Sequence, residues 1–365
     1  MEKPWPSLKL GDLEVPHPIV QGGMGVRISI HGLASAVSKA GGMGVIAAAA
    51  IGLEEPDAFK DFPGADERAL RYEIRKAREI VGDKPLGVNI MVAQTDYKKL
   101  VSIALEEGID VIFSGAGLPM SLPELAKGSE TKLVPIISSA RAGAIITRNW
   151  LKKYKRRPDA FVIEGALAGG HLGFTYEELA QNRAKPLLEI LKETREALRP
   201  YEEGELIPLI VAGGIFYGWE VRQALEAGAQ GVQMATRFVA TEECDAALAF
   251  KEAYVRATEE DVVIIKSPVG MPGRALRNPF VEAMMRGEKR PVTCPYHCLK
   301  PCIPEESPFC IALALLLAKK GDVKRGLIFA GARVAEVKEI TTVPRLFQQL
   351  MEEYVRGPES ISAPG

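Results

Sequence analysis

The chain has 365 residues, of which 47% are hydrophobic and 25% are charged, so an extensively disordered protein is excluded and a large core is expected. Its 46 basic and 47 acidic residues give a net charge of -1, which excludes a general attraction to nucleic acid or to an anionic membrane surface. The first ten residues lack an apolar core of signal-peptide length, and no apolar run is long enough to span a bilayer. We expect a cytoplasmic protein that acts on a small-molecule substrate.

Short apolar, β-branched runs alternate along the chain with longer segments in which apolar residues have helical spacing. Several of the short runs have no polar alternation, which is typical of parallel strands covered on both faces. Glycines at Gly41, Gly82, Gly108 and Gly228 follow helical segments and predict helix C-caps. The predicted helices include Ile30–Ala40, Asp66–Val81, Tyr97–Glu107 and Trp219–Ala227. The predicted strands are Pro18–Gln21, Met43–Ala49, Leu86–Met91, Val111–Ser114, Leu133–Ile137, Ala160–Glu164, Ile207–Ala212 and Gly231–Met234.

Eight strand–helix units predict an α/β fold, a (β/α)₈ TIM barrel, with an open doubly wound sheet as the competing architecture. The barrel is favoured because Gly-rich and polar residues repeatedly follow the strands, where barrel active sites are built. Residues 1–260 are assigned to the barrel, and residues 261–365 to a C-terminal cap or extension packed on it. The extension is predicted to contain a Gly/Pro-rich loop at Lys266–Pro279, a Cys-rich loop at Pro291–Cys310, and helices at Ile311–Lys320 and Val343–Arg356.

Small residues follow the seventh and eighth predicted strands. The first of these turns is Ala212-Gly213-Gly214, and the second is Gln233-Met234-Ala235-Thr236. In barrels these two loops commonly bind phosphate, because glycines let backbone N–H groups approach the anion. Thr236 and the following Arg237 are expected to add side-chain donors. Two glycines alone would indicate only a tight turn, but the second loop favours a phosphate site.

His171, one of four histidines, follows the sixth predicted strand and lies among glycines. An imidazole at this rim is suited to acid–base catalysis, because its ordinary pKa is near neutrality. The alternative is a loop histidine bonded to the backbone, and its position at a strand end favours the catalytic role. For Glu164, at the end of the same strand, a structural role and a contact with a ligand both stay open.

Glycines and a methionine follow the first predicted strand in Gln21-Gly22-Gly23-Met24, and Asn89 lies near the end of the third. Glycine lets a flat ring lie against the backbone, and methionine offers a polarizable face. Taken alone this is a weak signal, because Gly-rich turns are common. It becomes informative in combination with the other strand ends.

Taken in chain order, these motifs resemble those of nitronate monooxygenases, formerly called 2-nitropropane dioxygenases, and of the related FMN-dependent enoyl-acyl-carrier-protein reductases. The resemblance covers about residues 8–280 and implies an FMN-binding barrel, hence a flavoprotein. The motifs that carry it are Gln21-Gly22-Gly23-Met24, Gly87-Val88-Asn89, Gly115-Ala116-Gly117-Leu118-Pro119, Gly169-Gly170-His171-Leu172-Gly173, Ala212-Gly213-Gly214-Ile215 and Gln233-Met234-Ala235-Thr236-Arg237-Phe238.

The resemblance implies roles for several of the motif residues and makes His171 the catalytic residue. It also makes Lys266–Asn278 a lid loop that folds over the mouth of the barrel. The FMN phosphate is expected against Gly213, Gly214, Ala235 and Thr236. The isoalloxazine ring is expected near Gly22, Gly23, Met24 and Asn89. Further expected cofactor contacts are Gln21, Glu164, Gly169, Gly170, Ala212, Gln233 and Met234.

Four of the five cysteines gather in the Pro-rich part of the extension with the spacing C-x₃-C-x₃-C-x₇-C. Four thiolates suit zinc or an iron–sulfur cluster, although this spacing matches no common finger or ferredoxin pattern. The alternative is a helical stripe of small buried residues, which the neighbouring prolines disfavour. The best-known members of the resembled families lack this tail. The expected metal ligands are Cys294, Cys298, Cys302 and Cys310.

The leading functional hypothesis is an FMN-dependent oxidoreductase, a monooxygenase that uses dioxygen to convert alkyl nitronates to a carbonyl compound and nitrite. In this hypothesis His171 holds the nitronate or deprotonates a neutral nitroalkane. The second is an FMN- and NAD(P)H-dependent enoyl-thioester reductase, with a Cys-bound metal cluster as a further electron source. A non-flavin barrel, such as a phosphosugar-type lyase, and a non-catalytic flavin carrier are minor alternatives. The sequence leaves a homodimer open.

Overall fold

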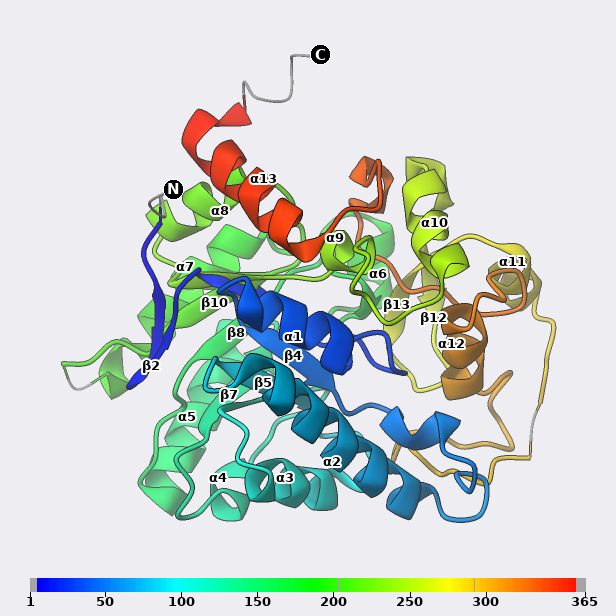
Figure 1. The fold of residues 1–365 in the computed structure, drawn as a ribbon, viewed down its shortest axis with the longest axis horizontal. Coiled ribbons are helices and arrows are strands. Elements are labelled where there is room, and N and C mark those ends of the chain that lie inside the picture. Colours follow the sequence, from blue (N-terminus) through cyan, green and yellow to red (C-terminus); the bar gives the residue numbers. More distant parts are fainter. Residues whose placement is uncertain (1–4, 203, 292, 359–365) are drawn as a thin grey trace.

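The computed structural model describes residues 5–202, 204–291 and 293–358. Eight parallel strands form one sheet in the order β3-β11-β10-β8-β7-β6-β5-β4, and a parallel bridge between Val20 and Met43 joins its two edges. Helices surround this sheet (Figure 1). The predicted TIM-like barrel and its eight strands are therefore confirmed. The barrel strands are β3 (Ile19–Gln21), β4 (Gly44–Ala47), β5 (Leu86–Met91), β6 (Val111–Gly115), β7 (Lys132–Ile137), β8 (Phe161–Glu164), β10 (Leu209–Ala212) and β11 (Gly231–Met234).

Capping residues mark the ends of several helices. Helix α2 starts after Asp61, whose side chain accepts from the Gly64 N–H, and it ends at Gly82 with φ +61°. The other predicted cap glycines also have positive φ. The helices are α1 (His31–Lys39), α2 (Phe62–Val81), α3 (Tyr97–Glu106), α4 (Leu122–Leu125), α5 (Ala140–Tyr154), α6 (Tyr176–Ala180), α7 (Leu187–Leu198), α8 (Gly218–Glu226), α9 (Thr236–Val239), α10 (Leu248–Arg256), α11 (Pro279–Met285), α12 (Ile311–Lys319) and α13 (Val343–Arg356). Short 3₁₀ helices lie at Ile51–Glu54, Arg199–Tyr201, Glu259–Asp261 and Val334–Glu336.

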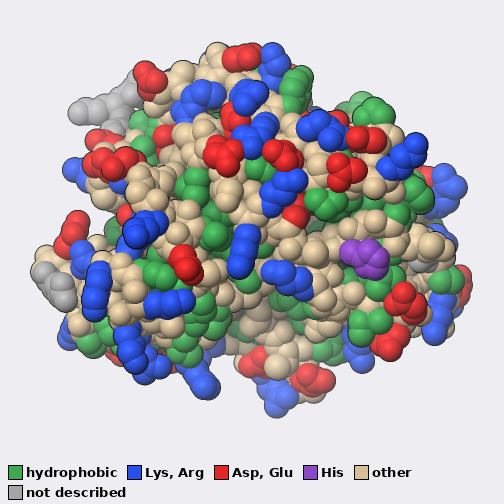
Figure 2. All heavy atoms as spheres, turned by 90° about the horizontal axis from the view of Figure 1, so that it is seen from below, with side chains coloured by type: hydrophobic (Ala, Val, Ile, Leu, Met, Phe, Trp, Pro, Cys, Tyr) green, Lys and Arg blue, Asp and Glu red, His purple; other side chains and the backbone are tan. Residues whose placement is uncertain are grey.

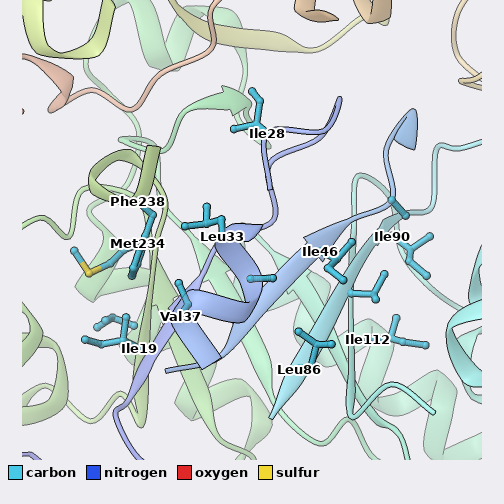
Figure 3. Close-up of a cluster of buried hydrophobic side chains, with 14 of the residues drawn as sticks. Ile19, Ile28, Leu33, Val37, Ile46, Leu86, Ile90, Ile112, Met234 and Phe238 are labelled. Carbon is cyan, nitrogen blue, oxygen red and sulfur yellow. The ribbon is translucent and has the colours of Figure 1, made fainter. Parts of the chain in front are cut away.

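Side chains of each barrel strand alternate between two cores, because successive residues of a strand face opposite sides of the sheet. Val111 and Phe113 of β6 pack in the barrel interior, whereas Ile112 between them packs against the surrounding helices. Figure 3 shows the outer layer, where Ile19 and Ile46 of the strands lie near Leu33 and Val37 of α1. The two cores hold the carboxyl ends of the strands in a fixed ring.

A short hairpin closes the amino-terminal end of the barrel. Its strands are β1 (Leu8–Leu10) and β2 (Leu13–Val15), and both contribute side chains to the interior core. Leu8 lies against Gly231, the first residue of β11. With this end filled by apolar side chains, the opposite end of the barrel is left for a ligand.

A second sheet lies beside the carboxyl ends of the barrel strands. It contains β12 (Val262–Lys266), β13 (Pro272–Leu276) and β9 (Gly170–His171), paired in antiparallel fashion in the order β12-β13-β9. The segment predicted as a lid loop is thus largely a hairpin. The β-branched run that forms β12 pairs with β13, and the glycine and proline residues form the turn between them. We call residues 262–276 the lid hairpin.

The C-terminal segment returns to the barrel. Helix α13, red in Figure 1, packs against α8 and α1. Within the residues that the structure describes, no helix is long and apolar enough to cross a membrane. On the face shown in Figure 2, Lys and Arg side chains are interspersed with Asp and Glu, in agreement with the near-zero net charge.

Candidate active site

A cavity of about 530 Å³ opens at the carboxyl ends of the barrel strands, and residues at or beyond the ends of all eight strands line it. This volume is in the range of small-molecule and cofactor sites. The structure brings together at this cavity the predicted catalytic residue, His171, and all but one of the predicted cofactor contacts. These contacts are Gly22, Gly23, Met24, Asn89, Glu164, Gly169, Gly170, Ala212, Gly213, Gly214, Gln233, Met234, Ala235 and Thr236.

The exception is Gln21, which is completely buried and does not line the cavity. Its amide donates to the Gly22 carbonyl at 2.5 Å, and its Oε1 accepts from the Val45 N–H at 3.0 Å. These bonds use the side chain to join β3 to β4, where the barrel closes. Gln21 is therefore placed as a structural residue beneath the cavity.

Arg237 is also placed away from the cavity, although it was expected to add a donor to the phosphate corner. Its guanidinium forms an ion pair with Glu353 of α13 at 3.1 Å and donates to the Phe216 carbonyl. It therefore fastens the C-terminal helix to the barrel instead of facing a ligand. Sequence reasoning missed this because Glu353 lies 116 residues away.

The turns after β10 and β11 present free backbone donors to the cavity. Gly213 and Gly214 have φ of +89° and +97°, so only glycine adopts this turn without strain. Their N–H groups, and those of Ala235 and Thr236, have no acceptor among the described residues. Gly331 closes this corner, since a Cβ there would lie 2.5 Å from Thr236 Oγ1. Free N–H groups on adjoining turns are suited to bind an anion such as a phosphate.

Polar side chains without partners line the neighbouring wall. Asn89, Glu164 and Gln233 face the cavity, and none has a side-chain hydrogen bond within the described part of the chain. Burial raises the pKa of the Glu164 carboxyl to about 7. Because enclosed polar groups normally have partners, this set is suited to a ligand that carries several hydroxyl or amide groups.

Glycines flatten the wall on the β3 side. A Cβ on Gly23 would lie only 2.5 Å from the Cβ of Asn89, so no side chain fits there. Gly22 and Met24 continue the same surface. A wall without side chains accommodates a planar ring, and the thioether of Met24 adds a polarizable contact.

His171 lies on β9, at the edge of the cavity and in contact with the lid hairpin. Its Nε2 is 2.8 Å from Ser267 Oγ, and its ring meets the edge of Phe329 with centroids 5.1 Å apart. Burial lowers the pKa of His171 to about 4, since desolvation disfavours the imidazolium. The imidazole is therefore neutral at pH 7.

The tail contributes cavity residues that no motif in the sequence predicted. Phe329, Ala330, Gly331 and Arg333 line the cavity, Phe329 beside His171 and the last two beside the phosphate corner. Arg333 donates to the Gly214 carbonyl at 2.9 Å and is paired with two glutamates, so it braces the turn. Apolar side chains extend another wall of the cavity at Met271, Leu299, Ile311, Ala312 and Leu315.

The structure does not contain the metal site expected at Cys294, Cys298, Cys302 and Cys310. Among residues 5–202, 204–291 and 293–358, no three His, Cys, Asp or Glu side chains gather as metal ligands do. Cys298 and Cys310 pack in one apolar cluster and Cys302 in another, 3.6 Å from Ser307 Oγ. The four thiols nevertheless lie within electrostatic range, because burial and then the neighbouring thiols raise the pKa of Cys298 and of Cys310. The metal prediction is corrected accordingly, and only Cys298 lines the cavity.

Comparison with known proteins identifies the family. The nitronate monooxygenase family matches residues 7–353 of the chain. This chain belongs to the nitronate monooxygenase family. Membership makes it an oxidoreductase that acts on a small-molecule substrate, and it implies a flavin cofactor. The predicted family resemblance is thus confirmed.

Within and around the nitronate monooxygenase family, named relatives differ in activity. The chain is 30% identical over 275 residues to (3aS,4S,5R,7aS)-5-hydroxy-7a-methyl-1-oxo-octahydro-1H-indene-4-carboxyl-CoA dehydrogenase of Mycobacterium tuberculosis, with 75% of this chain and 67% of that protein aligned. It is 26% identical over 296 residues to a probable nitronate monooxygenase of Staphylococcus saprophyticus, covering 75% and 79%. The solved structure of FabK from Thermotoga maritima is similar with a TM-score of 0.73 and 28% identity, over 95% of each chain.

Proposed function

We propose that the protein is an FMN-dependent oxidoreductase that oxidises alkyl nitronates to a carbonyl compound and nitrite. The observation that carries this proposal is the juxtaposition, in one cavity, of a neutral histidine and a glycine-walled surface beside free backbone N–H groups. The family match supports it. When bound, FMN supplies the electron acceptor for the nitronate, and dioxygen is the final oxidant.

The cavity residues fit FMN in three parts. The free N–H groups of Gly213, Gly214, Ala235 and Thr236 suit its phosphate. The unpaired side chains of Asn89, Glu164 and Gln233 suit its ribityl hydroxyls and ring amides. The surface formed by Gly22, Gly23 and Met24 suits the flat isoalloxazine.

The role of His171 is to bind and orient the substrate. Its neutral imidazole presents one N–H, which is suited to a nitronate oxygen. The apolar residues around it exclude water from the reacting carbon, which strengthens this hydrogen bond. Asn89 and Glu164 hold the cofactor side of the cavity. The chain thus positions two reactants and leaves electron transfer to the flavin.

A second candidate function is NAD(P)H-dependent reduction of an enoyl thioester. The apolar wall from the tail, at Leu299, Ile311 and Leu315, favours it because this wall suits a larger acyl chain. The likeness to FabK and to a carboxyl-CoA dehydrogenase supports it as well. In this function the His171 N–H would bind the thioester carbonyl.

One set of assays separates the two functions. The purified protein is expected to carry FMN, which its visible absorbance and mass spectrum identify. Ethylnitronate is then expected to consume dioxygen and release nitrite, and His171→Ala to abolish this turnover while keeping FMN. Reduction of the bound flavin by NADH, seen as a loss of its visible absorbance and coupled to turnover of crotonyl-CoA, would assign the second function if nitronates release no nitrite. A colourless protein without either activity would refute both.

A further inference from the structure

His171 is held by the lid hairpin through its backbone and through its side chain. Its backbone pairs with Gly273 of β13, and the next residue, Leu172, donates its N–H to the Pro272 carbonyl at 3.0 Å. Its Nε2 contacts the hydroxyl of Ser267 at 2.8 Å. Ser267 does not line the cavity, so it lies behind the imidazole and touches no ligand.

The position of Ser267 is itself fixed. Its N–H donates to the Met271 carbonyl at 3.1 Å, and its carbonyl accepts from the Gly270 N–H at 3.1 Å. Gly270, with φ +81°, allows the chain to turn within this short span. Only 8% of Ser267 is exposed, so water does not compete strongly for its hydroxyl. The hydroxyl is therefore a preorganised partner for the imidazole.

The hydrogen-bonding capacity of the Ser267 hydroxyl selects one tautomer of His171. Ser267 Oγ already accepts from the Val269 N–H at 3.4 Å, and its own proton has no acceptor other than His171 Nε2 among the described residues. If Nε2 carried the proton, the enclosed hydroxyl would accept twice and donate to nothing. With the proton on Nδ1, the Ser267 hydroxyl both donates and accepts, and Nε2 accepts its proton.

The other ring nitrogen is the one available to a ligand. Nδ1 has no partner within the described residues, and it is not among the fully buried unpaired atoms. His171 lines the cavity, so this accessible nitrogen is reached from the cavity. The tautomer that Ser267 selects thus presents an N–H donor to the substrate.

We propose that Ser267 is a positioning residue that fixes neutral His171 as the Nδ1–H tautomer, so that His171 acts toward the substrate as a hydrogen-bond donor and not as a base. The kinetic consequence of this inference rests on the proposed function, whereas the tautomer assignment does not. The lone pair of Nε2 accepts from Ser267, and Nδ1 carries its proton. Neither nitrogen is therefore free to remove a proton from carbon, and the enzyme should require a preformed anion or a polarised carbonyl.

Nitrogen NMR tests the tautomer without any turnover. The flavin-loaded protein is labelled with [¹⁵N]histidine, and His171→Gln assigns one signal pair among the four histidines. We expect Nδ1 to give the protonated type of resonance and Nε2 the unprotonated type, without change between pH 6 and 8. In Ser267→Ala the Nδ1–H population should fall, and Ser267→Thr, which keeps the hydroxyl, should restore it. Ser307→Ala removes a hydroxyl outside the cavity and should leave the spectrum unchanged.

Kinetics test the consequence. Loss of one neutral hydrogen bond predicts a kcat about 3- to 10-fold lower in Ser267→Ala, with unchanged FMN affinity and recovery in Ser267→Thr. Wild-type turnover should be far faster with ethylnitronate than with neutral nitroethane. A protonated Nε2 in the wild type would overturn the proposal, and this result does not depend on whether Ser267→Ala folds. A histidine spectrum of Ser267→Ala that is identical to that of the wild type would also overturn it. Absence of both nitronate and enoyl-thioester activity would refute only the proposed function.

Discussion

Replacement of Gly213 by alanine is the most direct test of the phosphate corner. Gly213 has φ +89°, and a Cβ there would lie 2.7 Å from the Gly165 carbonyl oxygen, a backbone atom that cannot rotate away. Placing an L-residue in such a conformation costs about 1–3 kcal/mol. The overlap adds about 1–3 kcal/mol. The turn must therefore shift, and its N–H groups move away from the phosphate.

The expected size of the effect follows from the hydrogen bonds at stake. Loss of one bond to a charged group costs about 1.5–3 kcal/mol. Since about 1.4 kcal/mol is a factor of ten in Kd, Gly213→Ala should bind FMN about 10- to 100-fold more weakly. Titration of the deflavinated protein with FMN, followed by quenching of flavin fluorescence, measures the affinity. Urea unfolding of the same sample measures stability.

Gly228→Ala provides the matched control. Gly228 follows the C-terminal end of α8 with φ +99°, but a Cβ there would meet no atom within 4 Å beyond its neighbours in the chain, and it does not line the cavity. It should lose about 1–2 kcal/mol of stability from backbone strain and keep wild-type FMN affinity. Equal FMN affinity of Gly213→Ala and Gly228→Ala would refute the assignment of the phosphate to this turn.

Three further predictions concern the cavity carboxyl, the barrel interior and the tail. Burial raises the pKa of Glu164 to about 7 from 4.5, so the contribution of this carboxyl to stability is full below pH 4.5 and is lost as pH rises through about 7. The Tm of the deflavinated protein should therefore fall between pH 5 and 8, and Glu164→Gln should make this fall smaller. An equal fall in the variant and the wild type would contradict this prediction. Phe113→Ala, at a fully buried interior position, should lower the free energy of unfolding by about 3–5 kcal/mol in urea titrations, and a loss below about 1 kcal/mol would contradict the packing. Arg237→Ala and Glu353→Ala should show a coupling energy of about 0.5–3 kcal/mol in a double-mutant cycle of unfolding free energies. Both variants should keep FMN affinity within about twofold of wild type. A large loss of FMN affinity in Arg237→Ala alone would instead identify Arg237 as a phosphate ligand.

The barrel could be predicted from the sequence because each strand is a short apolar run with its own turn signal. Leu86–Met91 and Gly231–Met234 were predicted with the bounds that the structure has. The lid hairpin was not predicted, because the Gly and Pro residues of its turn masked the β-branched run before it. Most predicted cavity residues lie at the carboxyl ends of barrel strands or just beyond them, so their convergence follows from the parallel topology.

Features that depend on distant partners could not be predicted. The contact of Ser267 with His171 spans 96 residues, and no local pattern announces it. Gln21 and Arg237 have the residue types of ligand donors, but neighbours distant in sequence use their hydrogen bonds. The cysteine spacing suggested a metal site, and the four thiols do lie within electrostatic range of one another, but among the described residues no three potential ligands are grouped closely enough to hold a metal ion. These features all concern the partners of side chains rather than the path of the chain.

The cavity can be completed only after the segment around Gly331 has been synthesised. The wall at Gly22 is made early by the ribosome, whereas the segment that closes the corner against Thr236 emerges more than 300 residues later. A nascent chain that ends before this segment would have the whole barrel sheet but an open corner. Tight flavin retention should therefore appear late, after the barrel itself has formed, and stalled chains of increasing length would reveal the step at which it is acquired.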